Sequence, residues 1–319
     1  MNSYSLSVYR ITLNKHLKKD ILENLSNFDN GKDFLSLIDM MFSSWKKDEN
    51  DNNIIKDENA KKVSRLKKDA QGNWIYHRHQ TYIDGIIESG DYGTQESIID
   101  IETGKPKYTK TPKDAALVPF YFMIYIEPNT PEGFLILERI GNIGILSVFD
   151  KAIRNIIGTM TDESLTLRIE PYLVPQLLKI NLAAVSGAKR VVLKGVKDNQ
   201  FKGKITSKNF AGCRTEVSFI APKKKYIQEI TNFIDSLRGK KQNEPYKVNN
   251  VECTDVAFEL DINGSQRTIS LAKMTNIGMN VDITRNVTID GTGYPVYSSL
   301  LNEANVILSY LVKNKMSRL

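Results

Sequence analysis

A ten-residue stretch without a charged side chain, Leu117–Ile126, constrains the fold most strongly. Its sequence, LVPFYFMIYI, is apolar or aromatic at nearly every position, so a strand formed here must be covered on both faces. A helix that spans a membrane needs about 20 apolar residues, and this run is shorter. After the turn sequence EPNTPEG, a second apolar run follows at Phe134–Ile140. The first run predicts a buried central strand, and the second predicts another apolar strand after the turn.

Strand and helix patterns surround these two runs. Residues Ser3–Leu13 alternate between apolar and polar positions, which predicts a strand. Residues 73–88 are also strand-like, with a break expected near Gly85. Apolar residues recur at helical spacing in Lys32–Lys46 and in Val296–Lys315. The sequence therefore predicts an α+β fold with mostly antiparallel sheets and several helices.

The length of 319 residues predicts two domains or subdomains, because domains commonly contain about 100–200 residues. We place the boundary near residue 160. The N-terminal α+β domain, 1–160, is expected to hold the buried aromatic strands and an exposed charged loop near 46–60. The remainder of that charged stretch, up to residue 69, is expected to be helical. The C-terminal α+β domain, 161–319, is expected to carry a basic segment and the terminal helix.

Positive charge is concentrated in the second half of the chain. Lys and Arg number 44 against 37 Asp and Glu, which gives a formal net charge of +7. Residues 189–247 alone hold 15 basic and 5 acidic residues, so the rest of the chain is slightly acidic. Basic surfaces bind phosphates independently of base sequence. This distribution favours a nucleic acid, DNA or RNA, as a partner.

The predicted nucleic-acid-binding residues are basic side chains of this segment, with Phe201 and Phe210 nearby as groups on which bases can stack. A solvated, lysine-rich face is the alternative interpretation, since lysine is abundant throughout the chain. The predicted contacts are Lys189, Arg190, Lys194, Lys197, Lys202, Lys204, Lys208, Arg214, Lys223, Lys224 and Lys225.

Two of the three histidines, His77 and His79, are two residues apart in a predicted strand and therefore share one of its faces. Paired imidazoles can act as general acid and general base in phosphodiester cleavage, or supply two metal ligands. The nearest carboxylates are Asp84, Glu88 and Asp91. We name His77, His79, Asp84 and Glu88 as candidate catalytic residues of a nuclease. The alternative is a solvated sheet face.

Common catalytic and cofactor motifs are absent from the sequence. It contains no P-loop, no GxGxxG and no GxSxG, and no spacing typical of a metal site. The glycine-bearing segments Gly141–Gly144 and Asp290–Gly293 are more typical of structural turns than of anion sites. The cysteines Cys213 and Cys253 form no CxxC pair and are compatible with a reducing compartment. We therefore assign no cofactor and no metal; only the nuclease alternative calls for a divalent metal.

The first residues, MNSYSLSVYRITL, lack the basic leader and apolar run of a signal peptide. We expect a cytoplasmic protein without a membrane partner, and the many Lys, Ile and Asn residues indicate an AT-rich, bacterial genome. The leading hypothesis is a bacterial nucleic-acid-binding protein of the kind encoded in phage-defence or mobile-element loci. One alternative is a nuclease or toxin-like effector that uses His77 and His79. Another is a protein-binding subunit of a multi-gene complex.

Overall fold

The computed structural model describes most of the 319 residues of the protein. Contacts among residues divide the chain into two units, Met1–Glu170 with Asn280–Leu319, and Pro171–Met279. The described segments are residues 3–16, 18–29, 31–45, 54–161, 164–172, 188–196, 215–223, 225–227, 246–248, 251–262, 265–270 and 280–316.

This division differs from the expected boundary near residue 160. The C-terminal helix α5 (Tyr297–Met316) belongs to the first unit, whereas the sequence placed it in a second domain that starts at 161. The cause is a short strand, β19 (Asn280–Asp282), which pairs with the first strand, β1 (Tyr4–Lys15). This pairing brings the C-terminal part of the chain next to its N-terminal strand. The helical spacing of apolar residues predicts that the helix packs on a hydrophobic core. It does not show to which of the two units that core belongs.

One sheet of 11 strands forms the central layer of the first unit. Its neighbouring strands from β1 onward are antiparallel. The spatial order is β12 (Leu165–Pro171), β1, β10 (Gly133–Ile140), β9 (Val118–Ile126), β6 (Tyr82–Asp91), β4 (Lys62–Leu66) and β3 (Ile55–Asp57). Short strands pair with this row: β2 (Lys18–Leu22) and β19 with β1, β5 (Tyr76–Arg78) with β6, and β11 (Ile143–Gly144) with β10.

The two apolar runs lie side by side near the centre of this sheet. The sequence predicts both strands and the central position of the first. Strand β9 pairs with β10 in a register that places Phe122 opposite Leu137. All side chains from Phe120 to Ile126 are buried. Burial on both faces explains why this strand is continuously apolar instead of alternating.

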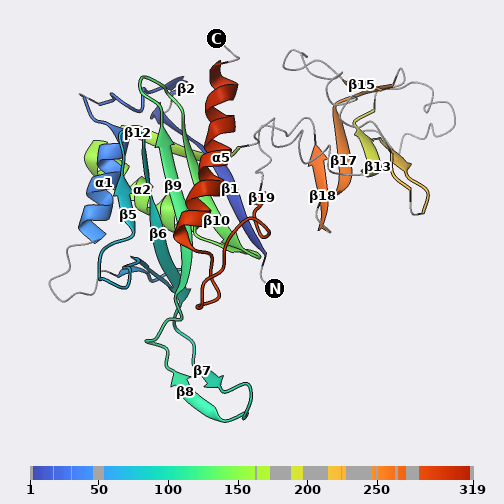
Figure 1. The fold of residues 1–319 in the computed structure, drawn as a ribbon. Coiled ribbons are helices and arrows are strands. Elements are labelled where there is room, and N and C mark those ends of the chain that lie inside the picture. The colour runs from blue at the N-terminus through green and yellow to red at the C-terminus, as the bar shows by residue number, and fades with distance from the viewer. Residues whose placement is uncertain are drawn as a thin grey trace. The chain divides into compact units, whose positions relative to one another are not determined.

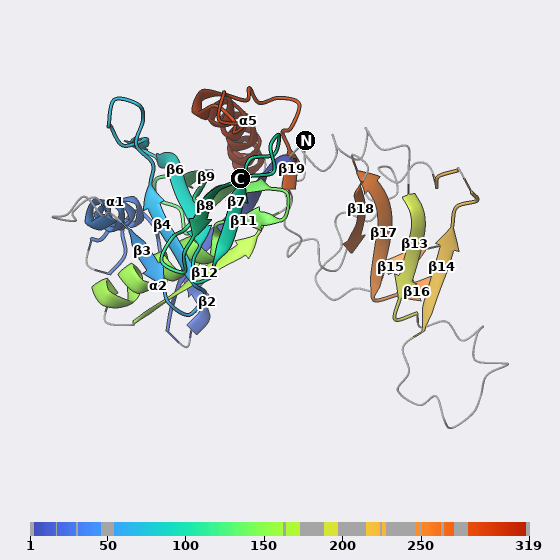
Figure 2. The same cartoon turned by 90° about the horizontal axis from the view of Figure 1, so that it is seen from below.

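Helices cover both faces of the sheet (Figures 1 and 2). The helices α1 (Phe34–Trp45) and α2 (Leu146–Thr161) lie on one face, where the ring of Phe42 stacks on that of Phe122 with centroids 5.0 Å apart. Helix α5 lies on the other face and buries an apolar stripe that begins at Leu300. The amphipathic helices expected at both ends of the chain are thus present and form the outer layers.

Successive strand residues point to opposite faces, so the two faces carry different chemistry. On β9, Phe122 points to α1 and α2, whereas the ring of Tyr121 points to α5 and lies 6.0 Å from that of Tyr297. On β6, Asp84 shares the α5 side with Tyr121, whose hydroxyl faces its carboxylate. The α5 face therefore contains buried polar groups within an otherwise apolar layer.

The strand-like segment 73–88 forms two strands, and the predicted position of its break is wrong. The chain turns at residues 79–81, between β5 and β6, while Gly85 lies inside β6. A Cβ built on Gly85 would come within 2.4 Å of the carbonyl oxygen of Ile75. The glycine therefore permits a close approach of the segment that leads into β5, and it does not end strand β6.

The prediction of a helix at the end of the charged segment 46–69 is also wrong. Residues Lys62–Leu66 form β4, which pairs with β6. Its Val63 and Leu66 are buried, and this burial outweighs the helical propensity of the surrounding lysines. Residues 46–53 of the expected charged loop lie outside the described residues.

The second unit contains a four-stranded antiparallel sheet and a two-stranded pair. Buried residues such as Leu193 and Phe258 form its apolar layer. The order of the larger sheet is β14 (Glu216–Ile220), β13 (Ala188–Lys194), β17 (Asp255–Ile262) and β18 (Ser265–Ser270), and the smaller pair is β15 (Tyr246–Val248) with β16 (Val251–Cys253).

A final hairpin, β7 (Glu96–Ile99) with β8 (Pro106–Lys110), extends from the first unit (Figure 1). The fold is α+β, with mostly antiparallel sheets, as the sequence predicts. In the part of the chain that the structure describes, no helix is both long and apolar enough to cross a membrane.

Candidate active site

The β5–β6 hairpin brings both candidate histidines to one carboxylate. His77 is directly opposite Asp84 in the antiparallel register, and directly opposed residues share a face. The Nδ1 atom of His77 lies 3.7 Å from Oδ1 of Asp84, and the Nε2 atom of His79 lies 3.6 Å from the same oxygen. The two imidazole centroids are 6.5 Å apart. Three of the four candidate catalytic residues therefore form one cluster.

The carboxylate and the imidazoles differ sharply in exposure. The side chain of Asp84 is 0% exposed, whereas those of His77 and His79 are 43% and 45% exposed. Burial raises the pKa of Asp84, while a hydrogen bond from Tyr297 and the charges of the two histidines act in the opposite direction. The Oδ1 atom has no hydrogen-bond partner within the described segments. The cluster therefore has a buried acceptor at its base and two accessible rings at its surface.

Tyr297, in the first turn of α5, connects two members of this cluster. Its hydroxyl donates a hydrogen bond to Oδ2 of Asp84 and lies 2.8 Å from Nδ1 of His77. Because its single proton goes to the carboxylate, the hydroxyl oxygen accepts from Nδ1–H of His77. Burial and the adjacent carboxylate raise the pKa of Tyr297 above its ordinary value, so it stays protonated. This arrangement leaves Nε2 of His77 free to exchange a proton with a bound molecule.

Two further tyrosines complete the surroundings. The hydroxyl of Tyr121, on β9, is 3.5 Å from Oδ2 of Asp84 and is oriented to donate to it. The ring of Tyr82 stacks on the imidazole of His79, with centroids 4.1 Å apart and an interplanar angle of 18°. The stacking holds one face of the His79 ring, and Asp84 lies at its Nε2 edge. Each imidazole therefore has a neighbouring tyrosine that orients it, Tyr297 for His77 and Tyr82 for His79.

Glu88, the fourth candidate, is not part of this cluster. It is four residues beyond Asp84 on β6, which places it about 13 Å away along the strand. Its carboxylate forms an ion pair of 2.8 Å with Nε of Arg65 on β4. Asp91, the other nearby carboxylate, is bound in the same way by Lys62, at 2.7 Å. Glu88 and Asp91 are close to the histidines in the sequence. They lie far from them in space because an extended strand rises by about 3.3 Å per residue.

Sequence reasoning missed the tyrosines. Tyr297 is 220 residues from His77 in the chain and reaches it only because α5 packs on the sheet of the same unit. Nothing in the local pattern around Tyr297 marks it as functional among the 14 tyrosines. Tyr82 could have been found by pairing the predicted strand with itself as a hairpin, which places it beside His79.

The basic segment is described only in part. Arg190 and Lys194 lie on β13, where Arg190 binds Glu259 at 3.1 Å and the hydroxyl of Ser218 at 2.9 Å. Lys189 is on the same strand. The described members beyond β14 are Lys223 and Lys225. Outside the described residues lie Lys197, Lys202, Lys204, Lys208, Arg214 and Lys224, as well as Phe201 and Phe210.

The two glycine-bearing segments are turns. In the first, Ile143–Gly144 folds back as β11 on the end of β10, and Gly141 adopts a positive φ of 57°. In the second, the carboxylate of Asp290 accepts a hydrogen bond from the backbone N–H of Thr292. Within the described segments, no group of three or more His, Cys, Asp or Glu side chains is arranged to hold a metal ion.

No protein-family model matches the chain, and no curated protein matches it in sequence. Function must therefore be inferred from the geometry of the site.

Proposed function

We propose that the protein is a nuclease that cleaves RNA by general acid–base catalysis at His77 and His79. The observation that carries this proposal is that two accessible imidazoles face one buried carboxylate, that of Asp84, at 3.7 and 3.6 Å. Two imidazoles in different protonation states can remove one proton and supply another within a single reaction. The positive charge that would attract a polyanionic substrate lies in residues 189–247, whereas the rest of the chain, which contains this cluster, is slightly acidic.

The proposed reaction needs only these proton transfers and a nucleophile within the substrate. One imidazole removes the proton of a ribose 2′-hydroxyl, and O2′ forms a bond to the adjacent phosphorus. The bond between phosphorus and O5′ breaks, and the second imidazole donates its proton to O5′. The products are a 2′,3′-cyclic phosphate and a free 5′-hydroxyl. DNA has no 2′-hydroxyl, so this chemistry selects RNA.

The geometry of the cluster suits these roles. The imidazole centroids are 6.5 Å apart, so one ring can accept the proton of the 2′-hydroxyl while the other donates a proton to O5′ of the same phosphodiester. Asp84 stabilises positive charge as it develops on a ring during proton transfer, and Tyr297 fixes the tautomer of His77. Asp84 and Tyr297 are accordingly positioning residues.

Nucleic-acid binding by the second unit is a separate proposal, supported by the excess of positive charge in residues 189–247. The described residues that would contribute are Lys189, Arg190, Lys194, Lys223 and Lys225. Of these, Arg190 also binds Glu259 within the same sheet. We place both activities in the bacterial cytoplasm on the basis of the sequence. We propose a phage-defence or mobile-element system because many bacterial proteins without a common catalytic motif belong to one.

The experiment is cleavage of an end-labelled single-stranded RNA and of a DNA of the same base sequence, in EDTA and in Mg²⁺. We expect cleavage of the RNA in both buffers, with 2′,3′-cyclic phosphate ends, and intact DNA. His77→Gln and His79→Gln should each lower the rate by about 10²–10⁴-fold. The matched control is His16→Gln. His16 is the one histidine of the chain besides His77 and His79, and it is exposed and lies outside the cluster.

Several outcomes would contradict the proposal. Full activity in the double variant of His77 and His79 would show that the cluster is not catalytic. Equal cleavage of RNA and DNA would exclude the 2′-hydroxyl mechanism. Binding of RNA without cleavage would favour the binding protein, and neither binding nor cleavage would favour the protein-binding subunit.

A further inference from the structure

His77 lies on a short strand, β5, whose side chains contact a different helix on each face. On the α5 face, Nδ1 of His77 lies 2.8 Å from the hydroxyl oxygen of Tyr297. Tyr76 and Arg78, the neighbours of His77 in β5, point to the opposite face, because successive strand residues alternate. There the ring of Tyr76 packs on that of Phe42 in α1, with centroids 5.1 Å apart. The strand that carries His77 is therefore held by α5 on one face and by α1 on the other.

Both neighbours of His77 bind aspartates that belong to α1 or directly precede it. The hydroxyl of Tyr76 donates a hydrogen bond of 2.5 Å to Oδ1 of Asp39 in α1. Nη2 of Arg78 lies 3.8 Å from Oδ2 of Asp33, the residue before α1. Asp33 also accepts a hydrogen bond from a backbone N–H in the first turn of this helix. The two side chains that flank His77 are therefore joined to the same helix.

The bond between Tyr76 and Asp39 is the stronger of these two contacts. Its length is typical of a hydroxyl that donates to a carboxylate, whereas the ion pair of Arg78 is longer and joins partly exposed side chains. Burial and the neighbouring carboxylate raise the pKa of Tyr76, so its hydroxyl keeps the proton that it donates. Strand β5 has only three residues and, among the described strands, pairs with β6. Side-chain bonds to α1 therefore add substantially to the few backbone bonds that hold it.

We propose that Asp39 is a positioning residue for His77. Through its bond to Tyr76, Asp39 holds β5 at the place where Nδ1 of His77 lies 3.7 Å from Asp84. Tyr297 orients the imidazole ring from α5, whereas Asp39 fixes the backbone from which that ring extends. The inference rests on the proposed nuclease activity, because the position of His77 affects a rate only if His77 takes part in the reaction.

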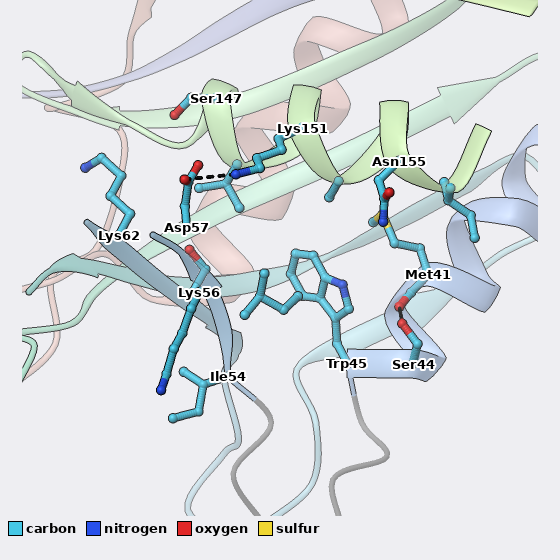
Figure 3. A pocket seen from close by; sticks show the side chains of 15 residues that line it. Met41, Ser44, Trp45, Ile54, Lys56, Asp57, Lys62, Ser147, Lys151 and Asn155 are labelled. Atoms are coloured by element: carbon cyan, nitrogen blue, oxygen red, sulfur yellow. Dashed lines mark hydrogen bonds and ion pairs between the residues drawn. The ribbon is translucent and has the colours of Figure 1, made fainter. Parts of the chain in front are cut away.

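The C-terminal end of α1 supplies a matched control. Met41, Ser44 and Trp45 line a cavity of about 740 Å³ between α1, α2 and the strands β3 and β4 (Figure 3). Asp39 is not among the residues that line this cavity. The hydroxyl of Ser44 donates a hydrogen bond of 2.6 Å to the carbonyl oxygen of Met41, within the helix itself. Ser44→Ala therefore removes a polar group from α1 while the bond between Tyr76 and Asp39 stays.

The kinetics of RNA cleavage test the proposal. Asp39→Ala and Tyr76→Phe should each lower kcat by about 10–100-fold with little change in KM, because a small displacement of a catalytic group slows the chemical step. Burial raises the pKa of Asp84, and the charge of a protonated His77 counteracts this. Withdrawal of His77 should therefore raise the pKa of Asp84 further and move the acidic limb of the pH–rate profile to higher pH. Asp39→Asn keeps an oxygen that accepts the bond and should restore most of the rate, and Ser44→Ala should match the wild type.

A double variant shows whether Asp39 and Tyr76 act through one bond. Asp39→Ala combined with Tyr76→Phe should be no slower than the slower single variant, since either change already breaks the bond. The NMR resonance of Cε1–H of His77 gives a second readout, which needs no activity. The chain has three histidines, so this resonance is assigned by its loss in His77→Gln. Asp39→Ala should shift it and leave the resonance of His16 in place.

Four kinetic results would overturn the proposal. They are a wild-type kcat with an unmoved acidic limb in Asp39→Ala, an equal loss of rate in Ser44→Ala, additive losses in the double variant, and an Asp39→Asn variant as slow as Asp39→Ala. A wild-type protein that cleaves no RNA would instead reject the proposed nuclease, and the His77 resonance would then decide alone. A shift in Asp39→Ala that Asp39→Asn reverses supports the positioning role, and an unshifted resonance overturns it.

Discussion

The hydroxyl of Tyr297 donates a hydrogen bond to the buried carboxylate of Asp84, which is 213 residues earlier in the chain. The same hydroxyl lies 2.8 Å from Nδ1 of His77. One side chain from the C-terminal helix therefore holds the two central members of a cluster that is otherwise built from a single hairpin. The cluster is complete only when α5 is packed on the sheet.

Tyr297→Phe tests whether the hydroxyl of Tyr297 positions His77 and Asp84 for catalysis. The variant loses the donor to Asp84 and the acceptor for His77, and we expect kcat to fall about tenfold or more with little change in KM. The hydrogen bond from Tyr297 lowers the pKa of Asp84, so its loss raises that pKa further. If Asp84 acts as a carboxylate, the acidic limb of the pH–rate profile should move to higher pH. Initial rates measured against pH check this.

The control for this substitution is Tyr310→Phe, on the same helix but outside the cluster. It should retain wild-type rates and the wild-type profile. A Tyr297→Phe enzyme with unchanged kcat and an unchanged acidic limb would show that the hydrogen bond has no role in catalysis.

Glu138 should make stability depend on pH. This residue is 1% exposed, and burial raises its pKa to about 7 from an ordinary value of 4.5, although the backbone N–H of Tyr121 donates to it. Between these two pKa values the folded state binds more protons than the unfolded state, so stability falls as pH rises. The loss from this group is about 3 kcal/mol between pH 4.5 and 7.

Glu138→Gln keeps the hydrogen bond from Tyr121 and removes the charge. Urea unfolding at several pH values should therefore give a flatter dependence for this variant than for the wild type. Glu102→Gln, at an exposed position of the β7–β8 hairpin, should follow the wild-type curve. Parallel curves for wild type and Glu138→Gln would show that Glu138 does not titrate in this range.

The sequence predicts the layers of this fold better than the assembly of the site. The continuous apolar run at Leu117–Ile126 and the helical spacing of the two terminal helices follow from local periodicity, which burial imposes directly. The shared face of His77 and His79 also follows from strand geometry, and their hairpin with Asp84 needs only a turn between them. Tyr297 is different, because its place depends on β19 pairing with β1.

The sequence shows which segment of the chain is basic, but it does not show which ion pairs the charged residues form. The segment 189–247 is basic in any structure, but the ion pair of Arg190 with Glu259 could not be read from its sequence. Glu88 is near the histidines in the sequence, but its ion-pair partner, Arg65, lies on a neighbouring strand. Ion pairs between strands depend on register, which local sequence does not specify.

Gly85→Ala should loosen the hairpin that carries the histidines. The added Cβ would come within 2.4 Å of the carbonyl oxygen of Ile75, so backbone must move. We expect a loss of about 1–3 kcal/mol in the free energy of unfolding, with a lower cleavage rate because His77 shifts relative to Asp84. The matched control is Gly158→Ala in α2, where a Cβ meets no atom within 4 Å. That change should stabilise the protein by up to about 1 kcal/mol, so equal stability of the two variants would contradict the close packing at Gly85.

Binding of RNA should depend on salt through the basic segment. The triple variant Lys202→Glu, Lys204→Glu, Lys208→Glu changes the charge of the chain from +7 to +1. If these lysines contact phosphates, affinity should fall and the slope of log K against log salt should become shallower by about 0.7 for each lost contact with single-stranded RNA. Fluorescence anisotropy with a labelled RNA and a His77→Gln, His79→Gln protein, which does not cleave in the proposed mechanism, measures this slope.

A matched triple reversal at Lys105, Lys107 and Lys113, in the first unit, gives the same net charge and should leave the slope unchanged. If both triple variants reduce the slope equally, long-range net charge and not the basic segment governs binding.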